Sequence, residues 1–518
     1  MTLARNVTTV GSATLLSRLL GFLRDMLIAA ALGAGALSDA YFAAFALPNL
    51  FRRLLAEGAL NAAFIPVWLR IRHDEGTEGA RRFGESILGL ALVGLGVLAL
   101  IGIAFAPVVI RLLAPGFAPG SERFILAVDY ARLAIPYLAI AGVVAVAAST
   151  LNAEGHTGAT SLGVVAFNVV LIAAVAVLLV QGMAATPAAG VVLASAVVAA
   201  GGAQLLFVGG ALMRSPWAPR RLRLSVSSDT RLFFALAVPG LIAAGIPQLK
   251  LIAGSIVASP SEAAVSWLYY AYRLYELPLG VVSVAIAAAI GPAVAASVRA
   301  ADTTAIASAQ SRAFETALGL ALPAAMALGL LASDIAAVLF ERGAFGPHDT
   351  MEVAAAIAAI SAGLPGHALE KALGAVSFAQ EDTRTPMLVA LVGLAAAIAG
   401  ALALFPRFGH VGVAAAIALS GWVGAALLCA VLARRHWLAT EPGLGGRLAR
   451  IVMASLAMAL VLIGLQWGLA AIPASSVALR VLRLAVLVAA GLATYALALQ
   501  LFGVTRLATL LAAVRERA

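Results

Sequence analysis

Charge, cysteine and lysine are all scarce in this sequence. Of its 518 residues only 11% are charged, whereas soluble domains carry about 25% charged residues. Cys429 is the single cysteine, so the chain has neither an intramolecular disulfide nor a metal site built from cysteines. Lysine occurs only at Lys250 and Lys371, and arginine supplies almost all of the positive charge. The low charge leaves no room for a large soluble domain.

Motifs of the common enzymes are also missing. The sequence contains no HExxH, no P-loop and no GxSxG in a strand-turn-helix context, and its six histidines are scattered. We therefore expect a protein that is not an enzyme, with no catalytic residue, no metal site and no cofactor. A transport cycle would then draw on the membrane potential, an ion gradient or the substrate gradient. Moving one charge through 100 mV supplies about 2.3 kcal/mol, which is enough to bias such a cycle.

Hydrophobic residues, in contrast, make up 63% of the chain, and the mean hydropathy is +1.03. Apolar runs of the roughly 20 residues that cross a bilayer recur along its whole length, without the alternation of barrel strands. The sequence therefore predicts an all-α polytopic membrane protein with about fourteen transmembrane helices. The predicted spans cover residues 5–32, 37–69, 83–113, 125–151, 159–181, 187–213, 231–257, 262–297, 312–339, 351–378, 385–405, 410–433, 448–471 and 479–512.

The distribution of arginine between alternate loops predicts how the chain is oriented. One set of loops contains clusters such as Arg220, Arg221 and Arg223, and the other set contains few arginines. Arginine-rich loops face the cytoplasm, and an even number of spans places both termini on that side. Because Arg18 interrupts the first apolar stretch, we expect an uncleaved first span and not a signal peptide. The arginines are not interleaved with aromatic residues on one face, which argues against nucleic-acid binding.

A weak internal repeat divides the chain into lobes. We expect a first six-helix lobe at 1–215, a second six-helix lobe at 226–437, and two further helices at 447–513. Because six is even, both lobes enter the membrane from the same side, as parallel repeats about a pseudo-two-fold axis. In such folds the substrate site lies between the lobes. Three pairs of residues separated by 226 positions indicate the repeat: Arg24 and Lys250, Pro66 and Pro292, and Thr157 and Thr383.

The first hairpin, residues 14–53, carries polar residues inside otherwise apolar spans, and several of them fall on one helical stripe. A central arginine costs about 2.5 to 3.5 kcal/mol on an insertion scale, so arginines at this depth need a partner or a water-filled cavity. The planar guanidinium pairs well with phosphate oxygens. We interpret the hairpin as the wall of a cavity for an anion. Its candidate substrate-binding residues are Ser17, Arg18, Arg24, Asp39, Asn49 and Arg52.

Internal ion pairs are the alternative interpretation of the same arginines. Arg24 could pair with Asp25 or Asp39, and Arg53 could pair with Glu57 four residues later. An arginine paired in this way would hold the helices together and leave little charge for a ligand.

The second lobe contains fewer candidates. Arg273 lies in the aromatic-rich span WLYYAYRLYELPLG, and Glu276 three residues later could neutralise it. If the lobes face one another, Arg273 projects toward the arginines of the first hairpin. Lys250 occupies the repeat position of Arg24, and we assign it to the same cavity.

Four stretches together resemble a known family. They are SRLLGFLRDMLIAAALGAG, SDAYFAAFALPNLFRRLLAEGALNAAFIPV, NAEGHTGAT and YRLYELPLGVVSVAIAAAIGPA. They look like the bacterial lipid II flippase family MurJ, also called MviN, within the multidrug/oligosaccharidyl-lipid/polysaccharide (MOP) exporter superfamily. The resemblance covers essentially the whole chain, and the first hairpin is its most specific part.

The resemblance implies a transporter of the bacterial cytoplasmic membrane that moves undecaprenyl-diphosphate-linked peptidoglycan precursor from the inner to the outer leaflet by alternating access. It implies that residues 447–513 form a groove for the lipid tail, and that the partners are lipid II, membrane lipids and enzymes of peptidoglycan synthesis. Some members have a sodium site of Asp, Asn and Thr, but spans 231–257 and 385–405 contain neither Asp nor Asn here. Positions that match the family's functional residues are Arg18, Arg24, Arg52, Arg273, Asp39 and Glu57.

Two other functions are compatible with such a membrane protein. A multidrug or O-antigen exporter of the same superfamily is the nearest, although an exporter of cationic drugs would favour acidic or apolar cavity residues. A scaffold for cell-wall assembly that transports nothing is the other, and it would pair all of its arginines internally.

Overall fold

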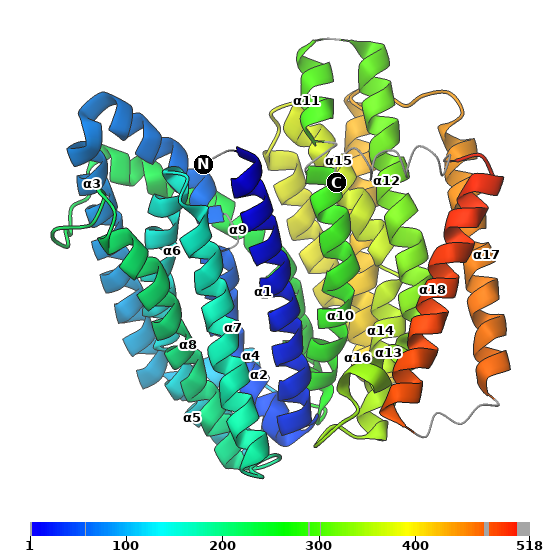
Figure 1. Ribbon diagram of the computed structural model, residues 1–518, viewed down its shortest axis with the longest axis horizontal. Coiled ribbons are helices and arrows are strands. Elements are labelled where there is room, and N and C mark those ends of the chain that lie inside the picture. The colour runs from blue at the N-terminus through cyan, green and yellow to red at the C-terminus, as the bar shows by residue number, and fades with distance from the viewer. Residues whose placement is uncertain (1–2, 57–58, 288–290, 301, 471–475, 505–518) are drawn as a thin grey trace. The chain divides into compact units, whose positions relative to one another are not determined.

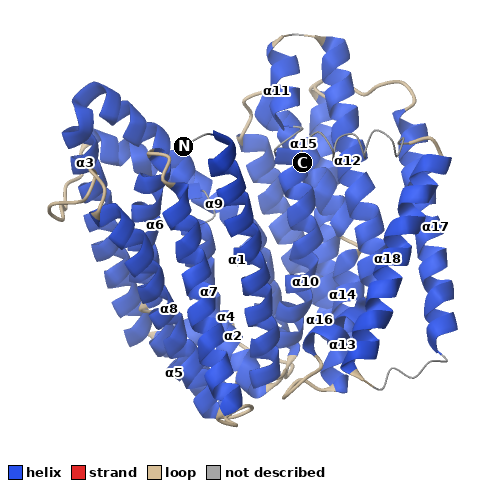
Figure 2. Cartoon of the chain, in the orientation of Figure 1, coloured by secondary structure: helices blue, strands red, loops and turns tan. Residues whose placement is uncertain are grey.

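The structure is a computed structural model that describes residues 3–56, 59–287, 291–300, 302–470 and 476–504. Every regular element in these ranges is a helix, and turns and short loops connect the helices (Figure 2). The predicted all-α, polytopic fold is confirmed. The chain divides into two compact units, Met1–Ser266 with Arg342–Gly346, and Trp267–Glu341 with Pro347–Ala518.

The first unit is a bundle in which α3 packs against α6 and α9, and α7 packs against α1 and α8 (Figure 1). It includes α9, which the repeat assigns to the second lobe; the lobe boundaries stay a prediction. The helices are α1 (Leu3–Leu32), α2 (Ala36–Ala56), α3 (Ala59–Ala104), α4 (Ala106–Leu113), α5 (Glu122–Ala134), α6 (Tyr137–Ala153), α7 (Thr157–Val180), α8 (Pro187–Met213) and α9 (Ser228–Ala258).

The second unit is built around α12 and α15, which pack against each other, with α16 against α15 and α17 against α12. The last two helices, α17 and α18, pack against each other, and α18 also contacts α13. The helices are α10 (Ala264–Ala285), which begins just before the unit boundary, α11 (Gly291–Arg299), α12 (Thr303–Leu330), α13 (Ala332–Phe340), α14 (Pro347–Ser361), α15 (Leu364–Ala379), α16 (Arg384–Arg434), α17 (Leu444–Ala470) and α18 (Val477–Leu501).

Two helices are far longer than a bilayer requires, and glycine divides each of them. The 46-residue α3 is interrupted at Gly76, with φ 70° and ψ −167°, and the 51-residue α16 is interrupted at Gly409, with φ 55° and ψ −141°. Glycine adopts a positive φ without steric strain because it lacks Cβ. About 20 residues cross the hydrocarbon core, so α16 contains two predicted spans, one on either side of Gly409. In α3 the segment before Gly76 holds the end of predicted span 37–69, and the segment after it holds most of span 83–113.

Each of the predicted spans falls on one helix or on consecutive helices, as far as the structure describes them. By length and composition alone, nine helices in the described ranges are apolar enough to cross a membrane, or ten if Ser228–Leu241 and Ala244–Ala258, bent by 46°, form one broken span. The number is smaller than fourteen because Ala36–Ala104 and Arg384–Arg434 each count once although each covers two predicted spans, and because the helices over spans 5–32 and 262–297 are not among those counted. Pro239 lies in predicted span 231–257, just before that bend, and lacks the backbone N–H donor of other residues.

The buried core of the first unit includes an aromatic cluster between α3 and α9. Phe64 stacks on Trp68 with ring centroids 5.6 Å apart, and Phe83 and Phe233 close the cluster at 5.3 and 6.1 Å from Phe64. Rings in such offset and edge-to-face arrangements contribute about 0.5 to 1.5 kcal/mol per pair beyond their burial. The cluster holds α9 on the bundle that carries the first hairpin.

Candidate functional site

Arg24 lies buried on α1 and is held by two partners. Its Nε and Nη2 donate to Asp25 Oδ1 at 2.9 and 2.7 Å, and its Nη1 donates to Asn168 Oδ1 on α7 at 3.1 Å. Only 4% of Arg24 is exposed. A charge can remain at this depth because a carboxylate neutralises it and an amide accepts from it. The internal pairing that we considered as the alternative for Arg24 is therefore present.

Arg52 approaches α7 next to the same contact. Its Nη2 donates to Asn49 Oδ1 at 2.9 Å, and its guanidinium lies 5.9 Å from the Phe167 ring centroid. Phe167 packs on Tyr137 at 5.5 Å between centroids, and the Tyr137 phenol is close enough to interact electrostatically with both Arg24 and Arg52. The structure thus brings these two predicted arginines to one place.

We call this group the arginine cluster. It joins α1, α2 and α7, and the Asp25 carboxylate pairs with Arg24. Guanidinium groups with amide and aromatic side chains around them suit an anionic group whose oxygens can accept several N–H bonds. The members of the arginine cluster are Arg24, Asp25, Asn49, Arg52, Phe167 and Asn168.

Ser17 and Arg18 lie one to two turns before Arg24 on α1. The Ser17 carbonyl oxygen accepts a hydrogen bond from Asn168 Nδ2 at 3.3 Å, and its side chain is half-buried. The Arg18 side chain is exposed. Ser17 thus contacts the cluster through its backbone, while Arg18 extends away from the buried core of its unit.

Asp39 lies at the opposite end of α2 from the cluster. Its Oδ1 accepts from the backbone N–H and the hydroxyl of Ser266, both at 2.9 Å, and Arg123 Nη1 lies 3.6 Å from its Oδ2. The residue is fully buried. At about 1.5 Å of rise per residue, some 20 Å of helix separates Asp39 from Arg52. The structure therefore gives Asp39 a structural contact and does not bring it to the arginine cluster.

The remaining candidates lie elsewhere. Arg273, in the second unit, pairs with Glu276 through Nη1 and Oε2 at 3.3 Å, as its i, i+3 spacing allows. Lys250 is buried on α9 in the first unit, with 5% of its surface exposed. Glu57 lies outside the residues that the structure describes.

Asn168 and Phe167 are the residues that sequence reasoning missed. Both lie in the apolar run LGVVAFNVVLIAA of α7. The signal for Asn168 was available, because an amide in the middle of a lipid-spanning run needs hydrogen-bond partners and therefore marks an interior face. Nothing in the sequence distinguishes Phe167 from the other apolar residues around it.

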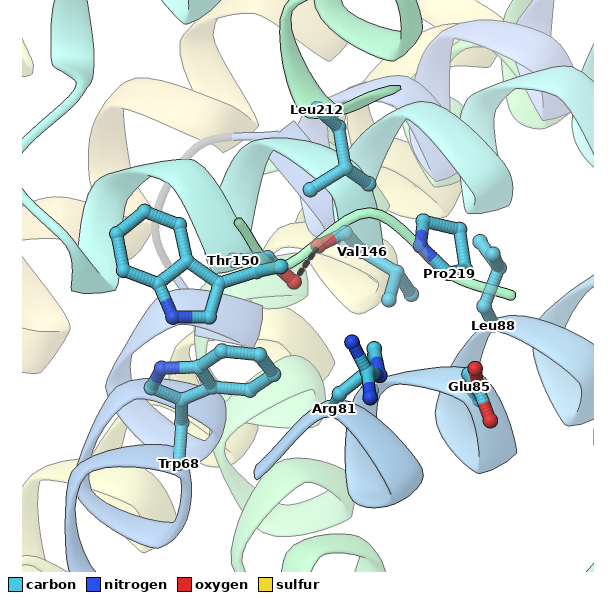
Figure 3. Close-up of a pocket in the computed structure, with 10 residues that line it drawn as sticks. Trp68, Arg81, Glu85, Leu88, Val146, Thr150, Leu212 and Pro219 are labelled. Carbon is cyan, nitrogen blue, oxygen red and sulfur yellow. Dashed lines mark hydrogen bonds between the residues drawn. The ribbon is translucent and has the colours of Figure 1, made fainter. Parts of the chain in front are cut away.

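A second polar site holds the linker that follows α8 (Figure 3). Glu85 Oε1 accepts from the backbone N–H groups of Arg220 and Arg221 at 2.8 and 3.3 Å, and its Oε2 accepts from Arg223 Nε at 2.8 Å. Trp217 enters the pocket lined by Glu85. The Glu85 carboxylate thus fixes the basic linker, and this site is structural.

Among the described residues, no three His, Cys, Asp or Glu side chains come together in a group that could hold a metal ion. The fold is that of a polytopic helical membrane protein, with arginines buried in its first bundle. The family model "Lipid II flippase MurJ" matches residues 28–481. The chain belongs to the lipid II flippase MurJ family.

Curated relatives match along nearly the whole chain. The "Probable lipid II flippase MurJ" of Rhizobium meliloti is 39% identical over 501 residues, which are 96% of this chain and 93% of that protein. Its counterpart in Rhizobium tropici is 36% identical over 469 residues, 90% of this chain and 87% of that protein. The "Lipid II flippase MurJ" of Burkholderia cenocepacia is 31% identical over 460 residues, 89% of each chain.

Solved structures share the fold at low sequence identity. A lipid II flippase MurJ in an inward closed conformation superposes with a TM-score of 0.77 at 20% identity, covering 95% of this chain and 98% of that chain. An inward-facing multidrug resistance MATE family transporter of the MOP superfamily gives a TM-score of 0.68 at 15% identity, with 81% and 94% covered. These similarities concern the fold alone.

Proposed function

We propose that the protein translocates lipid II, the polyprenyl-diphosphate-linked peptidoglycan precursor, from the inner to the outer leaflet of the bacterial cytoplasmic membrane. The observation that carries this proposal is the family match over residues 28–481. The buried arginine cluster supports it, because a diphosphate is the part of lipid II that needs cations.

Arg52 is the residue of the cluster that we assign to the diphosphate. Its Nη2 donates to the neutral amide of Asn49, and the planar guanidinium of an arginine fits phosphate oxygens. Arg24 has the carboxylate of Asp25 as a partner. A diphosphate would therefore compete with Asp25 for the Arg24 guanidinium, and release of the substrate would restore the pair.

The transport cycle that we propose is alternating access between the two predicted lobes, with the membrane potential or an ion gradient as the driving force. Both termini would face the cytoplasm, because an even number of spans would put them on the same side as the arginine-rich loops, such as the linker around Arg220. Lipid II and membrane lipids are the proposed partners, together with enzymes of peptidoglycan synthesis. Residues 447–513 would provide the groove for the lipid tail.

The scaffold alternative is favoured by one set of observations. Arg24 and Arg273 are both paired with carboxylates of their own helix, as a protein that binds no anion would have them. The similarity to MATE transporters does not favour drug export, because at 15% identity it reflects the fold. Binding and translocation of lipid II therefore have to be measured directly.

The test uses the wild type, Arg52→Ala and Arg52→Lys. For each protein, binding of lipid II is measured, and a leaflet-resolved assay in proteoliposomes measures translocation of lipid II with and without an imposed potential. An arginine that binds phosphate contributes about 1.5 to 3 kcal/mol through charge-assisted hydrogen bonds, so Arg52→Ala should weaken lipid II binding by about 10- to 100-fold. Arg52→Lys should recover only part of this loss, because an ammonium lacks the planar fork.

The matched control is Arg132→Ala, because Arg132 is an exposed arginine of the same unit whose partner Asp129 lies 3.6 Å away. It should bind and translocate lipid II like the wild type. Wild-type binding in Arg52→Ala would refute the role of Arg52, and a wild type that binds no lipid II would refute the proposed function.

A further inference from the structure

Three titratable side chains of the second unit, Tyr275, His367 and Glu370, lie near one another. None of them belongs to the arginine cluster. The Tyr275 hydroxyl of α10 lies 2.7 Å from His367 Nδ1 of α15. Tyr275 is 1% exposed. Glu370, one turn after His367 on α15, is close enough to interact electrostatically with the Tyr275 phenol. A buried phenol thus lies beside a partly buried imidazole, and a partly buried carboxylate is close enough to act on the phenol.

His367 Nδ1 has two neighbours, and one or the other can form a hydrogen bond with it whether or not Nδ1 carries a proton. It lies 3.0 Å from the Gly363 carbonyl oxygen, which can only accept, and 2.7 Å from the Tyr275 hydroxyl, which can donate or accept. With a proton on Nδ1, the imidazole donates to Gly363. Without that proton, Nδ1 accepts from Tyr275. The same arrangement of heavy atoms therefore satisfies Nδ1 both with and without its proton.

Two glycines of α16 make the space that these side chains occupy. A Cβ at Gly421 would collide with the imidazole of His367, and a Cβ at Gly424 would lie 2.7 to 3.0 Å from the carboxyl group of Glu370. Both glycines have ordinary helical backbone, although glycine destabilises a helix interior by about 0.5 to 1 kcal/mol relative to alanine. Space for His367 and Glu370 explains why glycine stands at these two positions.

Several charged groups on the helices around His367 contact residues other than His367. On α12, Arg312 donates to Ser308, and Glu315 pairs with Arg447. On α11, Arg299 donates to the Ala295 carbonyl. Along α16, His410 contacts the Glu352 carbonyl, and the residues that face α15 here are the two glycines. Groups that act on the site include Tyr272 and Glu276 of α10, which interact electrostatically with Tyr275, and Lys371 of α15, which interacts with Glu370.

We propose that Tyr275, His367 and Glu370 form a proton-binding site that changes its protonation during the transport cycle. A proton is the ligand that this set accommodates, because His367 Nδ1 has a hydrogen-bond partner both when it carries the proton and when it has lost it, without movement of a helix. The Glu370 carboxylate compensates the imidazolium charge that forms. The coupling of the site to transport rests on the proposed function, but the existence of the site does not.

The first experiment measures the site without any substrate. Full-length protein with ¹⁵N-labelled histidine is placed in nanodiscs, and the imidazole nitrogen shifts are followed between about pH 5 and pH 9, where histidine titrates. His367→Gln assigns the His367 signals. We expect these signals to titrate, and Tyr275→Phe to shift their midpoint. His73→Gln removes an exposed histidine bound only to Asp74 and should leave the His367 signals unchanged.

The second experiment tests coupling in proteoliposomes with an imposed gradient of about one pH unit, tenfold in proton concentration. The gradient should change the rate of lipid II translocation several-fold in the wild type and in His73→Gln, and not in His367→Gln. Gly421→Ala should lose the same response, because its methyl group displaces the imidazole, while alanine keeps the helix intact.

Two results would overturn the proposal: His367 signals that do not change with pH or with Tyr275→Phe, or a full gradient response in His367→Gln. A protein whose His367 titrates as expected but which moves no lipid II would support the proton site and refute the proposed function.

Discussion

Asn168 on α7 accepts a hydrogen bond from the Arg24 guanidinium of α1 at 3.1 Å, across 144 positions of sequence. Its own amide donates back to the Ser17 carbonyl of α1 at 3.3 Å. One buried side chain therefore fixes both the position of α1 and the orientation of its central arginine. In the hydrocarbon region no water replaces such contacts, so the geometry of the arginine cluster depends on this amide.

Asn168→Ala should lower both stability and transport. The substitution leaves the Arg24 Nη1 donor and the Ser17 carbonyl without this partner, at a cost of about 1 to 3 kcal/mol. Asn168→Asp keeps an acceptor for Arg24 and should recover much of the stability. Thermal unfolding in nanodiscs measures the effect, and equal unfolding temperatures for Asn168→Ala and the wild type would show that the contact is dispensable.

Asp39→Ala should impair folding and not the affinity for lipid II. It removes the acceptor of two Ser266 donors and leaves the Arg123 charge without its carboxylate, which costs about 3 to 5 kcal/mol for a buried pair. Asp39→Asn retains an oxygen for Ser266 and should accumulate better in the membrane. Protein level and unfolding temperature are the measurements.

The control for Asp39 is Asp129→Ala, which breaks an exposed pair with Arg132 and should cost at most about 1 kcal/mol. A stable Asp39→Ala protein with much weaker lipid II binding would instead place Asp39 in the binding site.

Glu85→Ala should release the linker after α8. The carboxylate accepts from Arg220, Arg221 and Arg223, and without it the linker backbone loses the bonds that keep it on α3. We expect trypsin to cut at these arginines several-fold faster than in the wild type, because proteolysis follows local opening. Glu75→Ala is the control, since Glu75 is an exposed carboxylate of the same helix and its removal should cost little. Unchanged cleavage of Glu85→Ala would refute this role.

Asp382, in the loop between α15 and α16, should make stability depend on pH. Partial burial raises the pKa of Asp382, but hydrogen bonds from Thr385 and the ion pair with Arg435 at 2.5 Å outweigh it and leave the pKa below the ordinary value. Because the folded pKa is lower than the unfolded pKa, the stabilisation is complete above the unfolded pKa, near 4, and is lost as the pH falls through the folded pKa.

Unfolding temperatures measured from pH 7 down to about pH 3 check this prediction for Asp382. Asp382→Asn should be less stable than the wild type at pH 7 and should lose less stability on acidification. Glu262→Gln, which changes an exposed carboxylate, is the control and should follow the wild-type curve. Parallel curves for Asp382→Asn and the wild type would contradict the prediction.

The local part of the candidate site could be predicted from spacing. Arg273 and Glu276 have the i, i+3 spacing of neighbours on a helix, and that pair forms. For Arg24 the sequence left Asp25 and Asp39 open, and the structure pairs it with Asp25. The contacts between helices could not be predicted, because nothing in the sequence around Asn168 indicates that its partner is Arg24. The assignment of Asp39 to a ligand cavity stays untested, and the structure gives that residue a different neighbour, Ser266.

Composition alone determined that this chain is a helical membrane protein, because apolar runs of bilayer length allow no other way to satisfy the backbone in lipid. It also determined that the arginines of the first hairpin need partners. Only the tertiary structure decided which partners they have: the packing of α7 against α1 places Asn168 beside Arg24, and the packing of α15 against α16 seats His367 on Gly421. These contacts depend on which faces of two helices pack together. The apolar pattern of either helix alone does not determine that.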